Sequence, residues 1–97
     1  MPATRHSNAY GFSDELRYAQ FQGENLRGSR FDGTVLTRGN FQFANLTNAH
    51  FTVRAYRTSF TGANLNGVNA RRSNFFGCDF RGATFVDADL TDAKFGK

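Results

Sequence analysis

The side chains that could carry out covalent or metal chemistry in this 97-residue sequence are one cysteine and two histidines. A catalytic thiolate needs a nearby base, and a metal site needs several ligands at short, regular spacings. Cys78, His6 and His50 show neither arrangement, and the sequence contains no GxxxxGK[ST] phosphate-binding loop. We therefore predict a protein that is not an enzyme and that binds no metal or cofactor.

Arginine and aromatic side chains offer more informative chemistry. The chain carries 12 lysines and arginines against 8 carboxylates, which gives a formal net charge of +4. Arginines interleaved with tyrosine and phenylalanine are typical of interaction surfaces, because the guanidinium group binds carboxylates and phosphates and also stacks on rings. Whether these residues share one surface depends on how the backbone places them.

A period of five residues runs through the chain from about Asp14 to Lys97. A large apolar residue recurs at every fifth position, here called position i, with a small residue at i−2 and mostly polar residues elsewhere. All six leucines and nine of the twelve phenylalanines occupy position i, and seven of the ten glycines occupy i+2. Neither a helix nor a regular strand has this period, so the chain must turn once in each block. The pattern predicts a solenoid with i and i−2 inside and glycine at turns that require positive φ.

One block is a residue short, because Phe51 and Phe60 are nine positions apart instead of ten. A gap at Thr52–Val53 makes the valine an inward i−2 residue and Ala55 the i residue. The alternative position for the gap would bury Arg54, which is costly without a partner. We therefore predict a shortened corner at Thr52–Val53.

The motif A-(D/N)-L, found at 44–46, 63–65 and 88–90, resembles the repeat of the pentapeptide repeat family. The resemblance covers residues 14–97 and implies an all-β solenoid, a right-handed quadrilateral β-helix of about four coils with four blocks in each coil. If successive coils stack side chain over side chain, every fourth block should carry a similar i residue. The sequence contains such columns, the clearest being Phe21, Phe41, Phe60 and Phe80.

The same columns place most of the arginines on one side of the rod. We predict a partner-binding surface, called the arginine face below, that comprises Arg17, Tyr18, Arg38, Arg54, Tyr56, Arg57 and Phe76, with Arg71 and Arg72 on its adjoining edge. The alternative interpretation is a solvated surface that only keeps the protein in solution. Outside this face, we expect Cys78 to be a small buried hydrophobic residue and His50 to be solvated.

Three functions are compatible with the arginine face. The first is a non-enzymatic scaffold that binds an unidentified, acidic protein partner. The second is implied by the resemblance, because some pentapeptide repeat proteins mimic DNA, bind gyrase-type topoisomerases and confer quinolone resistance. That role implies an acidic, elongated dimer, whereas this chain is short and basic. The third is direct nucleic-acid binding through phosphate contacts and base stacking.

The two ends of the sequence depart from the interior of the repeat. Residues 1–13 are a polar segment, which we interpret as a tail or as a cap in which Tyr10 and Phe12 cover the first coil. The C-terminal coil is expected to expose phenylalanine side chains, which favours end-to-end self-association unless nearby charged residues prevent it. No apolar run is long enough to span a membrane and no signal peptide is visible, so we expect a cytoplasmic protein without membrane contact.

Overall fold

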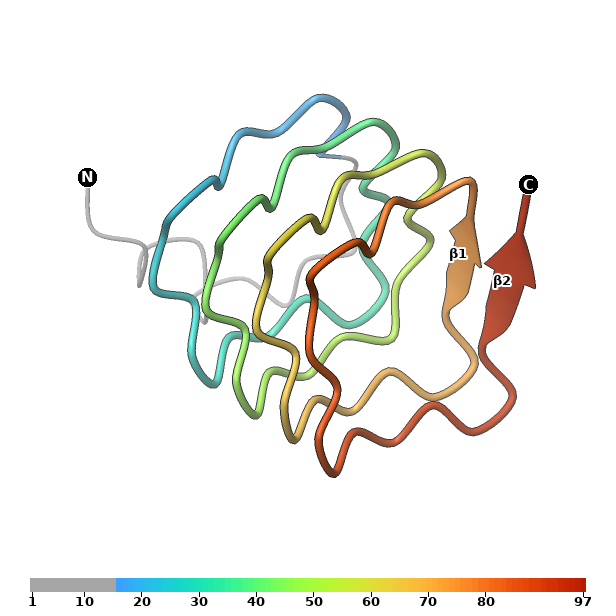
Figure 1. Cartoon of the computed structure of the whole chain (residues 1–97). Helices are drawn as coiled ribbons and strands as arrows, with labels where there is room; N and C mark the ends of the chain where they lie inside the picture. The colour runs from blue at the N-terminus through green and yellow to red at the C-terminus, as the bar shows by residue number, and fades with distance from the viewer. Residues whose placement is uncertain (1–15) are drawn as a thin grey trace.

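The computed structural model describes residues 16–97 as a rod of stacked coils. Figure 1 shows the coils lying one behind another, with the colour passing from blue to red along the rod. The expected tail or cap at residues 1–13, and Asp14 and Glu15 after it, lie outside the described residues. The fold is a right-handed quadrilateral β-helix, as the resemblance to the pentapeptide repeat family implies.

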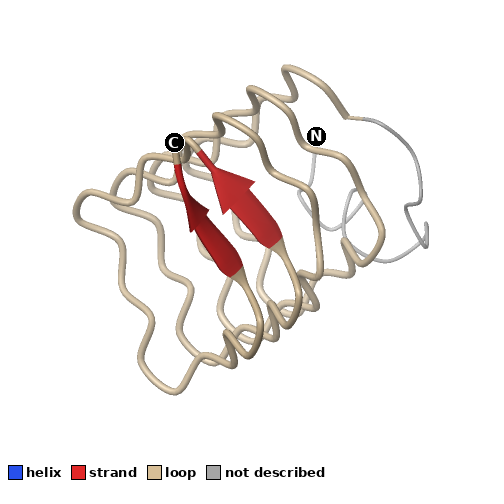
Figure 2. Ribbon diagram, turned by 90° about the vertical axis from the view of Figure 1, so that its right-hand side faces the viewer, coloured by secondary structure: helices blue, strands red, loops and turns tan. Residues whose placement is uncertain are grey.

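Neighbouring coils are joined by short parallel pairings. The two named strands, β1 (Asn74–Phe76) and β2 (Lys94–Gly96), pair in parallel, with Phe75 opposite Phe95. They lie side by side at one end of the rod in Figure 2. Isolated parallel bridges connect the other coils, because each flat side is too short for a longer strand. No helix in the described part of the chain is long and apolar enough to cross a lipid bilayer.

Each corner is a tight turn whose backbone explains the sequence pattern. The N–H of the fourth residue donates to the C=O of position i, as Ala63 does to Phe60 at 2.9 Å. Position i+2 has positive φ at every regular corner of residues 16–97, which is the geometry of a type II turn. Seven of these positions are the glycines that the sequence analysis assigned to turns, with φ between 70° and 82°.

Asparagine or aspartate at i−1 stabilises the same corners. Its side-chain oxygen accepts a hydrogen bond from the backbone N–H two residues later, as Asn45 does from Thr47 at 3.1 Å and Asn64 does from Asn66 at 3.0 Å. The backbones of Asn25, Asn45 and Asn64 form a ladder of bridges, but each side chain caps its own turn. The acidic or amide residue of the A-(D/N)-L motif therefore has a local structural role.

The interior consists of the predicted columns. The rings of Phe21, Phe41, Phe60 and Phe80 stack successively, with centroid distances of 5.0, 5.2 and 5.0 Å. The leucine column beside them is fully buried through its first three members, Leu26, Leu46 and Leu65. Burial of a large apolar side chain stabilises the fold by about 1.5–3 kcal/mol, so the stacked columns supply most of the driving force.

The shortened corner lies where the sequence predicts it. Val53 and Ala55 are buried while Arg54 is exposed, and no residue between Asn48 and Arg57 has positive φ. Bridged residues are 20 positions apart on either side of this corner and 19 apart where the pair spans it, as in Asn40–Ser59. The missing residue therefore shortens one corner and leaves the stacking register of the other three intact.

Candidate functional site

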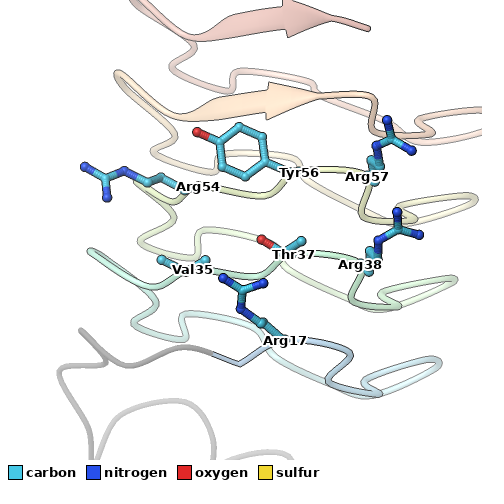
Figure 3. A pocket seen from close by; sticks show the side chains of 7 residues that line it. All are labelled: Arg17, Val35, Thr37, Arg38, Arg54, Tyr56 and Arg57. Atoms are coloured by element: carbon cyan, nitrogen blue, oxygen red, sulfur yellow. The ribbon is translucent and has the colours of Figure 1, made fainter.

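A shallow hollow of about 630 Å³ lies on one side of the rod. Seven residues from three successive coils line it: Arg17, Val35, Thr37, Arg38, Arg54, Tyr56 and Arg57. Figure 3 shows the three coils one above another, with Tyr56 near the centre and guanidinium groups around it. Four of the seven residues are arginines, and none is acidic.

The repeat itself brings these side chains together. Thr37 and Tyr56 are the i+1 residues of two stacked corners, and Arg38 and Arg57 are the i+2 residues directly after them. Figure 3 shows Arg38 and Arg57 projecting from the same edge of consecutive coils. Since coils are spaced by roughly 4.8 Å, each residue of one corner lies close to its counterpart in the next.

Arg38 and Arg57 occupy an unusual backbone conformation for arginine. Their φ angles are 58° and 53°, in the left-handed region that glycine fills at other corners. A residue with a side chain pays roughly 1–2 kcal/mol in this conformation. This conformation occurs at two stacked corners of the hollow, and both arginines are exposed.

Three arginines of the hollow differ from two arginines nearer the C-terminus in their ion pairing. Within residues 16–97, no carboxylate forms an ion pair with Arg38, Arg54 or Arg57. By comparison, a guanidinium nitrogen of Arg71 lies 3.3 Å from a carboxylate oxygen of Asp89. A guanidinium nitrogen of Arg81 lies 2.6 Å from a carboxylate oxygen of Asp79. The charges of Arg38, Arg54 and Arg57 are therefore not balanced by a carboxylate of residues 16–97, whereas those of Arg71 and Arg81 are.

These two ion pairs also affect the carboxylates. Hydrogen bonds from the Arg81 side chain and backbone hold the pKa of Asp79 below its usual value. Hydrogen bonds from the side chain and backbone of Thr91, with a smaller contribution from Arg71, lower the pKa of Asp89. Both residues are partly buried, and each carboxylate caps its own turn by accepting a hydrogen bond from the backbone N–H two residues later.

The aromatic part of the hollow is held in place by its neighbours. The Tyr56 hydroxyl accepts a hydrogen bond from Nδ2 of Asn74 at 3.3 Å. Its ring stacks on Phe76, with a centroid distance of 6.3 Å and an interplanar angle of 26°. Because both contacts fix the orientation of the ring, Tyr56 forms a rigid apolar surface between the charged side chains of the hollow.

The structure brings together five of the nine residues predicted for the arginine face: Arg17, Arg38, Arg54, Tyr56 and Arg57. Phe76 supports Tyr56 from the next coil, and Tyr18 lies at an exposed corner outside the lining of the hollow. Arg71 forms an ion pair with Asp89, and Arg72 lies on the adjoining edge of the rod, outside the lining of this hollow. Val35 and Thr37 were not predicted from the sequence, although their i−1 and i+1 positions beside Leu36 would have placed them here.

Cys78 has the character of a structural residue. Its thiol donates a hydrogen bond to the carbonyl of Ala55, and burial raises its pKa to about 11. A thiol in this state is mostly protonated at neutral pH and is a poor nucleophile. Among residues 16–97, no group of three histidine, cysteine or acidic side chains is arranged to hold a metal ion, and His6 lies outside this range.

Comparison with protein families identifies the repeat. A family profile described as pentapeptide repeats matches residues 15–52 and 56–96 in 8 copies. The interruption between the two matched ranges falls beside the shortened corner. No curated protein is similar enough in sequence to count as a relative.

Solved structures share the architecture at low sequence identity. The pentapeptide repeat protein Rfr23 from the cyanobacterium Cyanothece 51142 is 21% identical, with a TM-score of 0.81 over 84% of this chain and 59% of Rfr23. HetL from Nostoc, involved in heterocyst differentiation regulation, is 22% identical, with a TM-score of 0.43 over 81% and 39%. QnrB1, a fluoroquinolone resistance protein, is 15% identical, with a TM-score of 0.49 over 89% and 61%. The chain spans 59% of the length of Rfr23, and this likeness supports the fold alone.

Proposed function

This chain belongs to the pentapeptide repeat family, and on that premise we propose that it is a non-enzymatic scaffold whose arginine face binds an acidic surface of a partner protein. The observation that carries the proposal is the hollow around Tyr56. Four arginines line it, it has no acidic lining residue, and Arg38, Arg54 and Arg57 have no ion pair with residues 16–97.

The chemistry of the hollow suits carboxylates presented by a folded surface. A guanidinium group offers a rigid fork of donors that matches a carboxylate, and an aromatic floor adds apolar contact area. The arginines come from three stacked coils, so a matching partner would present several acidic groups at spacings of roughly 5 Å. An acidic helix or strand edge has groups at comparable spacings.

The DNA-mimic alternative requires the opposite charge. A protein that replaces DNA on a topoisomerase presents a negative surface, whereas this chain has a net charge of +4 and exposes Arg38, Arg54 and Arg57. The likeness to QnrB1 does not alter this argument, because its TM-score of 0.49 is too low to transfer a function. Direct nucleic-acid binding uses the same positive charge, so experiment has to separate it from protein binding.

The proposal can be tested by site-specific crosslinking in the organism that makes the protein. A photoreactive residue in place of Thr37 lies in the hollow, and one in place of Thr47 occupies the equivalent i+1 position on a different side. We expect a discrete protein crosslink from position 37, absent from position 47 and lost when Arg57→Gln is added. Equal crosslinking from both positions, or crosslinks to nucleic acid only, would contradict the proposal.

A further inference from the structure

The shortened corner contains a second, smaller hollow, called the notch below. It has a volume of about 250 Å³ and is lined by Gly33, Thr34, Thr52, Val53, Arg54 and Arg72. A water molecule occupies about 30 Å³ in the liquid, so the notch has room for a small ion together with several waters. It lies on a different corner of the rod from Tyr56, and only Arg54 lines both hollows.

The notch exists because one corner residue is missing. At regular corners the i+2 residues of successive coils stack at roughly 4.8 Å. Here Gly33 of the coil before and Arg72 of the coil after have positive φ and occupy i+2, but the coil between them has no i+2 residue. Two neighbouring corners therefore project beyond the shortened one and form the walls of a recess.

The backbone at the bottom of the notch is already satisfied. Thr52 N–H donates to Oδ1 of Asp32 at 2.9 Å, and Val53 N–H donates to the Ser73 hydroxyl at 2.9 Å. The carbonyl of Thr52 accepts from Gly33 N–H at 2.8 Å. Because these backbone groups have hydrogen-bond partners within the protein, the notch does not need a bound ligand to be stable.

The remaining donors in the notch come from side chains. Arg54 and Arg72 both line it, and neither forms an ion pair within residues 16–97. Thr52 also lines the notch, and its hydroxyl makes no hydrogen bond to the described residues. The nearby Asp32 carboxylate reduces the positive potential, but it already accepts the hydrogen bond from Thr52 N–H.

The two arginines at this corner have different surroundings. Arg71 and Arg72 are adjacent in the sequence, yet Arg71 pairs with Asp89 on the surface while Arg72 lines the notch. Arg72 has a φ of 61°, so an arginine again occupies a position where glycine would be unstrained. Arg72 therefore has no ion pair within residues 16–97, whereas the charge of Arg71 is balanced by Asp89.

We infer that the notch is a binding site for a single oxyanion group, a phosphate or a carboxylate, held between Arg54 and Arg72 with Thr52 as a third donor. Two guanidinium groups in a partly enclosed recess form charge-assisted hydrogen bonds that are stronger than those of isolated surface arginines. This inference does not rest on the proposed function, because the notch can bind a free oxyanion whether or not the arginine face binds a protein.

Inorganic phosphate is the simplest probe for this site. Two-dimensional amide NMR spectra of the full chain at low ionic strength should show saturable shifts at Gly33, Thr52 and Arg72 in the millimolar range. Arg72→Gln should abolish saturation, while Arg30→Gln, which removes an exposed arginine outside the notch lining, should preserve it. Diffuse, linear shifts in the wild-type chain, or unchanged saturation in Arg72→Gln, would overturn the inference.

A second variant tests the origin of the site. Inserting one glycine between Thr52 and Val53 restores a five-residue block and should fill the notch while leaving the coils stacked. We expect this variant to keep its β-type circular dichroism and to lose saturable phosphate binding. Phosphate binding that survives in the folded insertion variant would contradict the inference.

Acetate in place of phosphate identifies the kind of group that the site accepts. Saturable shifts with acetate at the same amides support a carboxylate source, and shifts with phosphate alone support a phosphate source. The double variant Arg38→Gln/Arg57→Gln separates this site from the arginine face, because it leaves both notch arginines unchanged. It should bind phosphate as the wild type does even if it fails to bind an acidic partner.

Discussion

The side-chain oxygen of Ser73 lies 2.9 Å from the backbone nitrogen of Val53, one coil away, and accepts its hydrogen bond. The same hydroxyl donates to the carbonyl of Phe51 at 2.7 Å. A regular corner would satisfy its backbone with a tight turn, but the shortened corner has no residue for one. Ser73, which is fully buried, therefore replaces the missing turn with two hydrogen bonds of its own.

Ser73→Ala should destabilise the protein by about 1–3 kcal/mol, because it leaves a buried N–H and a buried C=O without partners. Urea unfolding followed by circular dichroism measures this change. Ser59→Ala is the matched control, since Ser59 is only partly buried and its hydroxyl contacts only the Thr61 hydroxyl, at 3.3 Å. Equal loss of stability in the two variants would show that Ser73 does not support the corner.

Phe60→Ala should cost about 3–5 kcal/mol, because it opens a cavity in the middle of the stacked phenylalanine column. Phe60 is fully buried between Phe41 and Phe80. Arg57→Ala, three residues earlier and exposed, should change the free energy of unfolding by no more than about 0.5 kcal/mol. Urea unfolding of the two variants measures both changes in the free energy of unfolding. Similar losses of stability would contradict the assignment of inward and outward positions.

Cys78 should make the folded protein less stable at alkaline pH. Burial raises the pKa of the folded thiol to about 11, whereas an unfolded thiol has a pKa of about 8.5–9. The unfolded chain therefore loses this proton first, and the contribution to stability, complete below about pH 8.5, falls as pH rises toward 11.

Urea unfolding at pH 8 to 11 should show this decline, and Cys78→Ala should flatten part of it. Alanine fills the same i−2 position at Ala44 and Ala63, so the variant is compatible with the fold. A pH dependence identical to that of the wild type would show that the thiol is not the titrating group.

Self-association through the coil formed by residues 78–97 stays a prediction. Phe95 is 47% exposed and Val86 is 62% exposed, while Phe85 and Leu90 are only partly buried. Stacking a second copy on the end of this coil would bury the i residues Phe85, Leu90 and Phe95. We expect light scattering to show a dimer whose mass falls to that of a monomer in Phe95→Lys, and a monomeric wild type would contradict this prediction.

The period of five specified the fold because it constrains every coil in the same way. Bulk at i, a small residue at i−2 and glycine at i+2 each have a direct physical counterpart in the stacked core and the type II turns. The shortened corner was predictable as well, since only one position for the gap keeps Arg54 out of the interior. Repetition thus makes a short sequence unusually informative about its backbone.

The surface could be predicted less completely. Columns of outward residues correctly brought Arg38, Tyr56 and Arg57 together, but they could not show that Arg71 pairs with Asp89 while Arg72 remains unpaired within residues 16–97. The ion pairs that a surface arginine forms depend on its side-chain conformation, which the period of five does not constrain. The notch could not be predicted from the sequence either. A missing residue locates the shortened corner, but it does not show which side chains surround the space that results.

We propose that the arrangement of arginines, and not the net charge alone, creates a surface for acidic protein groups. Polyglutamate is a suitable probe, titrated against the full chain at low salt and followed by calorimetry. Nucleic acid can be tested in parallel with single-stranded and duplex DNA at the same ionic strength. Clearly tighter binding of DNA, lost in the same variants, would replace a protein partner with nucleic acid.

The deciding comparison is between two double variants with the same change in net charge. Arg38→Gln/Arg57→Gln removes two arginines of the hollow, and Arg27→Gln/Arg30→Gln removes two exposed arginines elsewhere. We predict that the first weakens polyglutamate binding about tenfold or more, a loss of about 1.4 kcal/mol, and that the second changes it by no more than about twofold. Equal weakening in both variants would show that polyglutamate responds only to net charge, and would contradict the assignment of the arginine face as a binding site.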